Sequence, residues 1–135
     1  MGPLDKYILP DDSLKATATG FQLKFYSNWY RSLPISALGM LNLNLNGQSI
    51  AQEDCKIEYD GKTYTMKDLP NQYNTWWFVL DPAILHVNNH NIHLAKGQRC
   101  DIEVELGLLI PYVLTGKEEN PLFATAKVRK NLLCA

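Results

Sequence analysis

The sequence has little that would assign it to a specialised class of protein. Its 13 Lys and Arg residues nearly balance its 14 Asp and Glu residues, and no basic stripe is present, so a nucleic-acid partner is not expected. The longest apolar run, residues 106–114, contains glycine and proline and is too short to span a bilayer. The N-terminus lacks a basic region followed by a long apolar segment, so no secretory signal is predicted. We therefore expect neither a nucleic-acid partner nor a membrane partner.

Cysteine is scarce, and its spacing excludes the common uses of paired thiols. Cys55, Cys100 and Cys134 are odd in number, far apart, and form no C-x-x-C pair. A structural zinc site needs four organised ligands, and a secreted disulfide scaffold usually has an even number of cysteines. Cys55 and Cys100 occupy apolar positions of alternating segments, which predicts buried free thiols. We therefore expect this protein to be located in the reducing cytoplasm.

What the sequence does contain is alternation of apolar and polar residues with a period of two. This pattern is typical of half-buried β-strands, and only residues 66–72 favour a short helical turn. With no βαβ rhythm, it predicts an all-β fold: one domain over residues 1–135, an antiparallel β-sandwich, with a small β-barrel as the alternative. The clearest alternating segments are residues 20–26, 40–46, 55–66, 100–112 and 121–133.

Two local signals refine the strand prediction. Asp60-Gly61 is the residue pair that a type I′ hairpin turn prefers, and a two-residue loop there pairs Tyr59 with Lys62. The second signal is Pro111, which is expected to end the strand that begins at residue 100, because proline cannot donate a ladder hydrogen bond.

Three histidines lie within eight residues, at positions 86, 90 and 93. If residues 88–91 formed a hairpin loop, His86 and His93 would be direct cross-strand neighbours, with Cβ atoms roughly 5 Å apart, and could share a metal ion. A metal site also needs a third ligand and groups that orient the rings, and the nearby sequence offers none. Solvated histidines are the favoured interpretation, and a His86/His93 metal site is the alternative.

Asp101, Glu103 and Glu105 form an acidic stripe that could seat a cation or an acid–base pair. An ordinary solvated sheet face, matched by Lys127 and Arg129 on a neighbouring strand, is the favoured reading. The sequence contains no glycine-rich phosphate loop, nucleophile elbow or Ser-His-Asp pattern, so a stand-alone enzyme is not expected.

Aromatic segments are the strongest functional signal. Adjacent Trp76 and Trp77 in a strand point to opposite faces, so at most one can enter the core. Exposed Trp, Tyr and Arg dominate protein interfaces, whereas the alternative is that these rings fold back and plug the sandwich. We favour a docking loop at residues 28–36, kept out of a sheet ladder by its proline. The candidate interface residues, for which we predict contact with a partner, are Trp29, Tyr30, Arg31, Pro34, Trp76, Trp77 and Tyr112.

The order of several segments resembles the small β subunit of the bacterial C-glycoside deglycosidases. The segments are GFQLKFYSNWYRSLPIS, LNLNLNGQSI, IEYDGKTYTMKDL, WWFVLDPAIL and VELGLLIPY. The resemblance runs from about Asp5 to Tyr112, and its most telling parts are Tyr30, Arg31, Pro34 and Ser36, the Asn-Gly turn, and residues 110–112. None of these is a catalytic signature, so the resemblance assigns no catalytic residue to this chain.

The resemblance implies a two-subunit lyase. Its larger α subunit is a TIM barrel similar to sugar isomerases and epimerases, and carries a divalent metal, typically manganese. The substrate is a C-glycoside, such as a glucosyl flavonoid, already oxidised at C3 of the sugar. A ketone at C3 acidifies the C2 proton, the metal holds the resulting enediolate, and the aryl carbon leaves by elimination. The present chain would bring no cofactor of its own. A stand-alone carbohydrate- or flavonoid-binding module, using Trp76 or Trp77 for stacking, is the alternative function.

Overall fold

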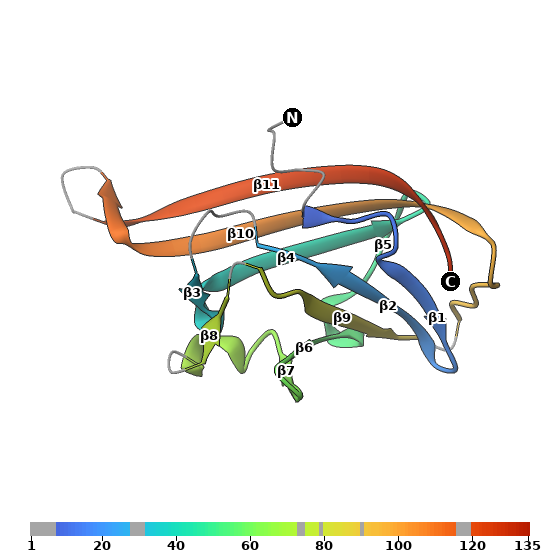
Figure 1. Ribbon diagram of the computed structural model, residues 1–135, viewed down its shortest axis with the longest axis horizontal. Helices are drawn as coiled ribbons and strands as arrows, with labels where there is room; N and C mark the ends of the chain where they lie inside the picture. The colour runs from blue at the N-terminus through green and yellow to red at the C-terminus, as the bar shows by residue number, and fades with distance from the viewer. Residues whose placement is uncertain (1–7, 28–31, 73–74, 79, 90, 116–119) are drawn as a thin grey trace.

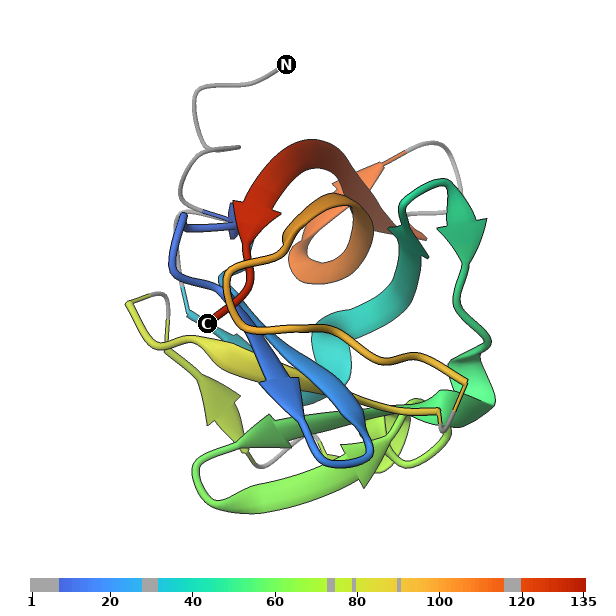
Figure 2. The same cartoon turned by 90° about the vertical axis from the view of Figure 1, so that its right-hand side faces the viewer.

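The computed structural model describes residues 8–27, 32–72, 75–78, 80–89, 91–115 and 120–135, of which 110–115 and 120–123 are described by their backbone alone. Two antiparallel sheets pack face to face, and a small third sheet lies at one end (Figures 1 and 2). The all-β prediction is confirmed, and none of the sheets formed by the described strands closes into a barrel. Among the described residues, no helix is long and apolar enough to cross a bilayer.

The five-stranded sheet has the order β1-β2-β9-β6-β7, so β9 is its central strand. The four-stranded sheet has the order β11-β10-β4-β5, and the two-stranded sheet pairs β3 with β8. Three short 3₁₀ helices connect strands, at Ile35–Ala37 (η1), Gln52–Asp54 (η2) and Leu69–Asn71 (η3). The strands are β1 Leu14–Thr17, β2 Gly20–Phe25, β3 Leu33–Pro34, β4 Leu38–Leu45, β5 Gln48–Ser49, β6 Cys55–Tyr59, β7 Lys62–Thr65, β8 Trp76–Trp77, β9 Ala83–Asn88, β10 Arg99–Thr115 and β11 Asn120–Leu133.

The core lies between the two large sheets, because each contributes its apolar face. Phe21, Leu23 and Phe25 of β2 are fully buried, and their neighbours along β9 are buried as well. From the opposite sheet, the even-numbered side chains of β10 from Cys100 to Leu108 are buried, as the alternation of residues 100–108 predicts. Each Å² of apolar surface buried in this way stabilises the folded chain by about 25 cal/mol. A shift of one residue would turn these side chains to the solvent, so the alternation fixes the register of the strands.

The hairpin predicted at residues 55–65 is confirmed in its register and its turn. Tyr59 pairs with Lys62, and Ile57 lies opposite Tyr64. The turn residues have positive φ angles, 53° at Asp60 and 77° at Gly61, as a type I′ turn requires. The helical turn predicted within residues 66–72 is present as η3.

The prediction that Pro111 ends its strand is wrong. β10 continues to Thr115, although its pairing with β11 shifts register between Ile110 and Leu114 and then resumes where Leu114 lies opposite Pro121. Proline removes a backbone donor, and an irregularity in the ladder is one way in which a strand tolerates that loss.

The cysteine prediction is confirmed, since Cys55, Cys100 and Cys134 are all buried and free. Burial, with the nearby charges of Asp54 and Glu53, raises the pKa of the Cys55 thiol to about 11. A thiol with such a pKa is almost entirely protonated at neutral pH, so Cys55 is a packing residue and a poor nucleophile.

Candidate partner-binding site

The structure brings together two of the predicted interface residues that are far apart in sequence. In the small sheet, Pro34 of β3 lies directly opposite Trp76 of β8, and Leu33 lies opposite Trp77. Directly opposed residues of an antiparallel pair share one face, so Pro34 and Trp76 are side-by-side neighbours. The expectation that Pro34 keeps its segment out of a sheet ladder is therefore wrong. A two-residue edge strand accommodates proline, because such a strand has one side without ladder bonds.

The two adjacent tryptophans divide between core and surface. Trp77 is 1% exposed and packs edge-on against Phe25, with ring centroids 5.6 Å apart and planes at 83°. Its indole Nε1 donates a hydrogen bond to the carbonyl oxygen of Asp81 at 2.9 Å, so its one polar atom is satisfied. Trp76 is 52% exposed. Trp77 anchors the segment to the core, and Trp76 remains available at the surface.

A hydroxyl group buried beneath this segment fixes the chain beyond Trp77. Tyr59 Oη accepts a hydrogen bond from the backbone N–H of Phe78 at 3.0 Å and donates one to Asp81 Oδ2 at 3.1 Å. The backbone N–H of Asp81 in turn donates to the carbonyl oxygen of Phe78 at 2.9 Å. Burial raises the pKa of Tyr59, and the carboxylate of Asp81 adds to that effect, while the N–H of Phe78 opposes it. Tyr59 therefore stays protonated and acts as a donor at neutral pH.

Three large apolar side chains project from this fixed segment. Trp76, Phe78 and Leu80 are 52%, 58% and 85% exposed, and they follow one another at every second position. We call these three residues the apolar patch. Trp77 is buried in the core and Tyr59 hydrogen-bonds to Phe78 and Asp81, so the described residues on both sides of the patch are anchored to the core. Exposed large apolar groups gathered in five consecutive residues are typical of an interaction site.

The structure does not place the side chains of the remaining predicted interface residues. Trp29, Tyr30 and Arg31 lie outside the described residues, so their predicted contact with a partner stays a prediction. Tyr112 lies in β10, within the span where the pairing with β11 shifts register, and its side chain is not among those described.

His86 and His93 are not brought together. β9 ends at Asn88, and residues 91–98 continue as turns and irregular chain, so the hairpin that would oppose the two rings is not formed. His86 instead faces Gln22 and Lys56 on its neighbouring strands, with its Nε2 atom 2.7 Å from Glu58 Oε1. Within the described part of the chain, no group of three or more His, Cys, Asp or Glu side chains is placed to hold a metal ion.

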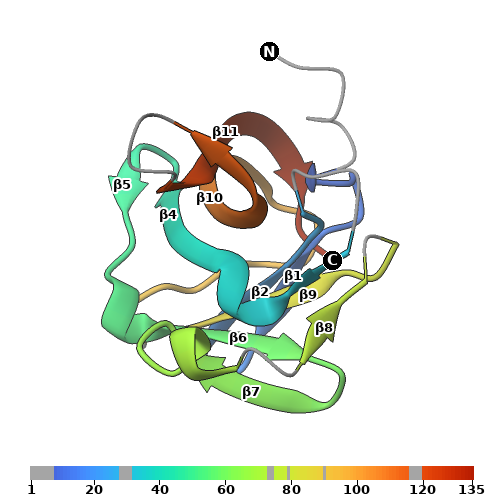
Figure 3. The same ribbon diagram turned by 90° about the vertical axis from the view of Figure 1, so that its left-hand side faces the viewer.

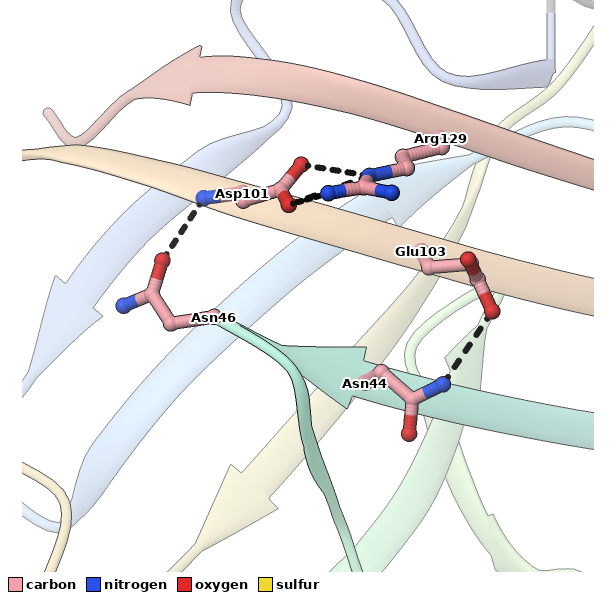
Figure 4. A network of polar contacts seen from close by, with 5 residues as sticks. All are labelled: Asn44, Asn46, Asp101, Glu103 and Arg129. Carbon is pink, nitrogen blue, oxygen red and sulfur yellow. Dashed lines mark hydrogen bonds and ion pairs between the residues drawn. The ribbon is translucent and has the colours of Figure 1, made fainter.

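Two of the three carboxylates in the acidic stripe of β10 form ion pairs with side chains of β11, and Figure 4 shows the contact between Asp101 and Arg129. Arg129 Nη2 lies 2.6 Å from Asp101 Oδ2, and Lys127 Nζ lies 3.3 Å from Glu103 Oε1. Asn44 donates to Glu103 Oε1 at 3.1 Å. Hydrogen bonds from Arg129 lower the pKa of Asp101. The favoured reading of a charge-matched sheet face is confirmed for Asp101 and Glu103, whereas Glu105 accepts a hydrogen bond from Asn42.

Sequence reasoning did not single out Leu80, Tyr59 or Asp81 for this site. The Asp81-Pro82 pair indicates a chain break, but nothing local reveals that the carboxylate meets a tyrosine hydroxyl from β6. Leu80 lies in the turn that follows β8, where no period predicts which side chains are exposed.

Comparison with known proteins supports the resemblance. The family described as C-glycoside deglycosidase beta subunit matches residues 4–112. A C-glycoside deglycosidase beta subunit from Arthrobacter globiformis is 32% identical over 78% of this chain and 80% of its own length. One from Microbacterium trichothecenolyticum is 29% identical over 68% of each chain. A 3′-dehydrocarminate deglycosidase beta subunit from a Microbacterium species is 26% identical over 78% of each. The match covers every strand of the five-stranded sheet and the apolar patch, and it ends within β10, before β11 begins. A match of this extent shows that the chain belongs to the C-glycoside deglycosidase beta subunit family.

Proposed function

We propose that this chain is the non-catalytic, non-metal-binding subunit of a heteromeric lyase that cleaves the carbon–carbon bond between sugar and aglycone in 3-oxo-C-glycosides. The observation that carries the proposal is the family match over residues 4–112. The name of one relative, a 3′-dehydrocarminate deglycosidase beta subunit, supports a substrate oxidised at the 3′ position. Flavonoid C-glucosides are the substrate class that we propose. The three free buried thiols support a cytoplasmic complex.

The proposed reaction is an elimination. A C-glycoside has no glycosidic oxygen to protonate, so hydrolysis by two carboxylates cannot cleave it. A ketone at C3 acidifies the hydrogen at C2. A base removes that proton, the electron pair of the C2–H bond forms the C1–C2 double bond, and the C1–aryl bond breaks. The aryl carbon keeps the bonding pair and takes up a proton, which gives the free aglycone and an unsaturated keto sugar.

We assign the acid–base groups of this reaction to an α subunit, a TIM barrel similar to sugar isomerases and epimerases. A divalent metal ion on that subunit, which we propose to be manganese, supplies charge stabilisation for the oxygens at C2 and C3. The role of the present chain is mechanical: a rigid β-sandwich that stabilises the barrel and borders the entrance to its active site.

A reconstitution experiment tests the proposal. The chain, a candidate sugar-isomerase-like barrel subunit, and their mixture are each given a 3-oxo-C-glucosyl flavonoid, and aglycone release is followed by chromatography. We expect release from the mixture, and manganese to be found with the barrel by elemental analysis. Aglycone release by the chain alone, at a rate near that of the mixture, would overturn the subunit role.

The exposure of Trp76 favours one other function, a stand-alone module that stacks a sugar or flavonoid ring on this indole. Quenching of tryptophan fluorescence by a flavonoid C-glucoside in the absence of any barrel would support it. A Trp76→Phe variant, in which Trp77 remains as a reporter in the core, would show whether the quenched ring is the exposed one.

A further inference from the structure

Resting on the proposed function, we propose that the apolar patch of Trp76, Phe78 and Leu80 is the central contact through which this chain docks on the α subunit. Pro34 extends the patch from the neighbouring strand, because it lies directly opposite Trp76.

The first support is that the patch is held in place before any partner arrives. The backbone N–H of Ile35 donates to the carbonyl oxygen of Thr75 at 2.7 Å, which ties the start of β8 to η1. On the other side, Tyr59 holds Phe78 and Asp81. A surface already fixed in its bound form loses little conformational freedom on association, so more of its contact energy appears as affinity.

The second support is chemical. All three side chains of the patch are apolar, two are aromatic, and the only carboxylate of the segment, Asp81, is engaged by Tyr59. Interface hot spots are enriched in tryptophan and lie in desolvated centres ringed by weaker contacts. The partner surface that fits is therefore an apolar depression with few charges.

The size of the patch indicates which partner fills it. With about 150–250 Å² for each large side chain, the three exposed fractions leave roughly 400 Å² of apolar surface. Two copies of this chain meeting through the patch alone would bury roughly 800 Å² in total, which is less than a stable interface needs. The interface must therefore continue past the patch whatever the partner is, and the match to a beta subunit family favours a different subunit as that partner.

Such a partner would find a second element at the same end of the sandwich. β3 and η1 lead directly into β4, whose first residue, Leu38, lies opposite Leu108 of β10. Beyond Leu108, β10 pairs with β11 alone among the described strands, so a two-stranded ribbon projects past β4 (Figure 1), and Figure 3 views the molecule from that end. Isolated two-stranded ribbons are marginally stable in water, so a partner seated on the patch and the ribbon would stabilise both.

The test measures the affinity of the full chain for the barrel subunit by titration, and the thermal melting of each variant. The patch variants are Trp76→Ser and Phe78→Ser. The matched control is Leu133→Ser, a residue 49% exposed at the end of β11, on the side of the molecule away from β8 (Figure 1). We expect each patch variant to raise the dissociation constant about thirtyfold, and the control to leave it unchanged. Melting temperatures should stay within about 2 °C of the unsubstituted chain, because the replaced side chains are exposed.

The outcomes separate this inference from the proposed function. If the unsubstituted chain binds the barrel and restores cleavage, but the patch variants bind as tightly, the docking site is overturned and the subunit function stands. If the unsubstituted chain does not bind the barrel, both are overturned. Self-association of the chain that is lost in Phe78→Ser would show that a second copy of the chain covers the patch. A patch variant that binds the barrel normally but raises the KM of the complex for the C-glycoside would show that the aglycone contacts the patch. Either result would overturn the docking site.

Discussion

The hydroxyl of Tyr59 donates a hydrogen bond to the carboxylate of Asp81 across 3.1 Å, and this contact joins the core hairpin β6–β7 to the segment that carries the apolar patch. The same hydroxyl accepts a hydrogen bond from the N–H of Phe78, so one oxygen holds a backbone group and a side chain of the segment.

We expect Tyr59→Phe to lower the free energy of unfolding by about 1–2 kcal/mol, because it leaves the Phe78 N–H and the Asp81 carboxylate without their partner. It should also weaken binding of the barrel subunit, since the patch loses its support. Urea titration of the isolated chain measures the first effect, and binding titration the second. Tyr64→Phe is the matched control, because the Tyr64 hydroxyl is buried with no hydrogen-bond partner in the described structure. Its removal should leave stability unchanged or slightly raised, and a loss equal to that of Tyr59→Phe would contradict the prediction.

Gly20 sits where the chain passes close to β9. A Cβ atom added there would lie 2.0 Å from the carbonyl oxygen of Val87, and the backbone φ of +156° is one that other residues rarely adopt. We expect Gly20→Ala to cost about 3 kcal/mol of stability, because a backbone atom cannot move aside cheaply. Gly61→Ala, in the hairpin turn with open space around it, should cost about 1 kcal/mol from its positive φ alone. Equal losses in thermal melts of the two variants would argue against the close approach of β2 and β9.

The raised pKa of Cys55 makes stability depend on pH above neutrality. In the unfolded chain this thiol ionises near its ordinary pKa of about 9, whereas in the folded chain it ionises at about 11. The stabilisation is complete below pH 9 and is lost as the pH rises through 11, by on the order of 2 kcal/mol. Because other groups titrate in this range, the measurement is the difference between the original chain and Cys55→Ala in urea titrations from pH 8 to 11. A parallel pH dependence in both proteins would count against the assignment.

The charge-matched stripe on β10 should tolerate substitution without loss of function. In Glu103→Gln, the new side-chain amide oxygen stays within reach of the neighbours of Glu103. The substitution removes one charge from the surface ion pair with Lys127. We expect cleavage by the reconstituted complex to stay within about twofold of the original. A large fall in kcat with normal binding would show instead that this carboxylate takes part in the reaction.

Sequence reasoning succeeded where the determining contacts are local. The register of residues 55–65 follows from alternation and from the Asp60-Gly61 turn, both contained in eleven consecutive residues. Likewise, the paired charges of β10 and β11 follow from two long alternating strands that are consecutive in the chain.

It failed where the determining contact joins distant segments. The pairing of Pro34 with Trp76 involves strands of two residues, which are too short to show any period. Alternation indicated that at most one of Trp76 and Trp77 enters the core, and the contact with Phe25 identifies Trp77 as that residue. The alternative in which His86 opposes His93 is not realised for a related reason. The neighbours of β9 are β2 and β6, whose sequences lie far from residue 93.

The central position of β9 also has a kinetic consequence. The hairpin β6–β7 and the ribbon β10–β11 join strands that are consecutive in sequence, so they can form early. β9, by contrast, must pair residue 87 with residue 21 across the intervening chain, and such non-local pairings slow folding. Until β9 is inserted, β2 and β6 each present an unpaired edge that invites pairing with other chains. The chain is therefore more prone to aggregate before β9 is inserted than after folding is complete. Production at low temperature should favour correctly folded chain.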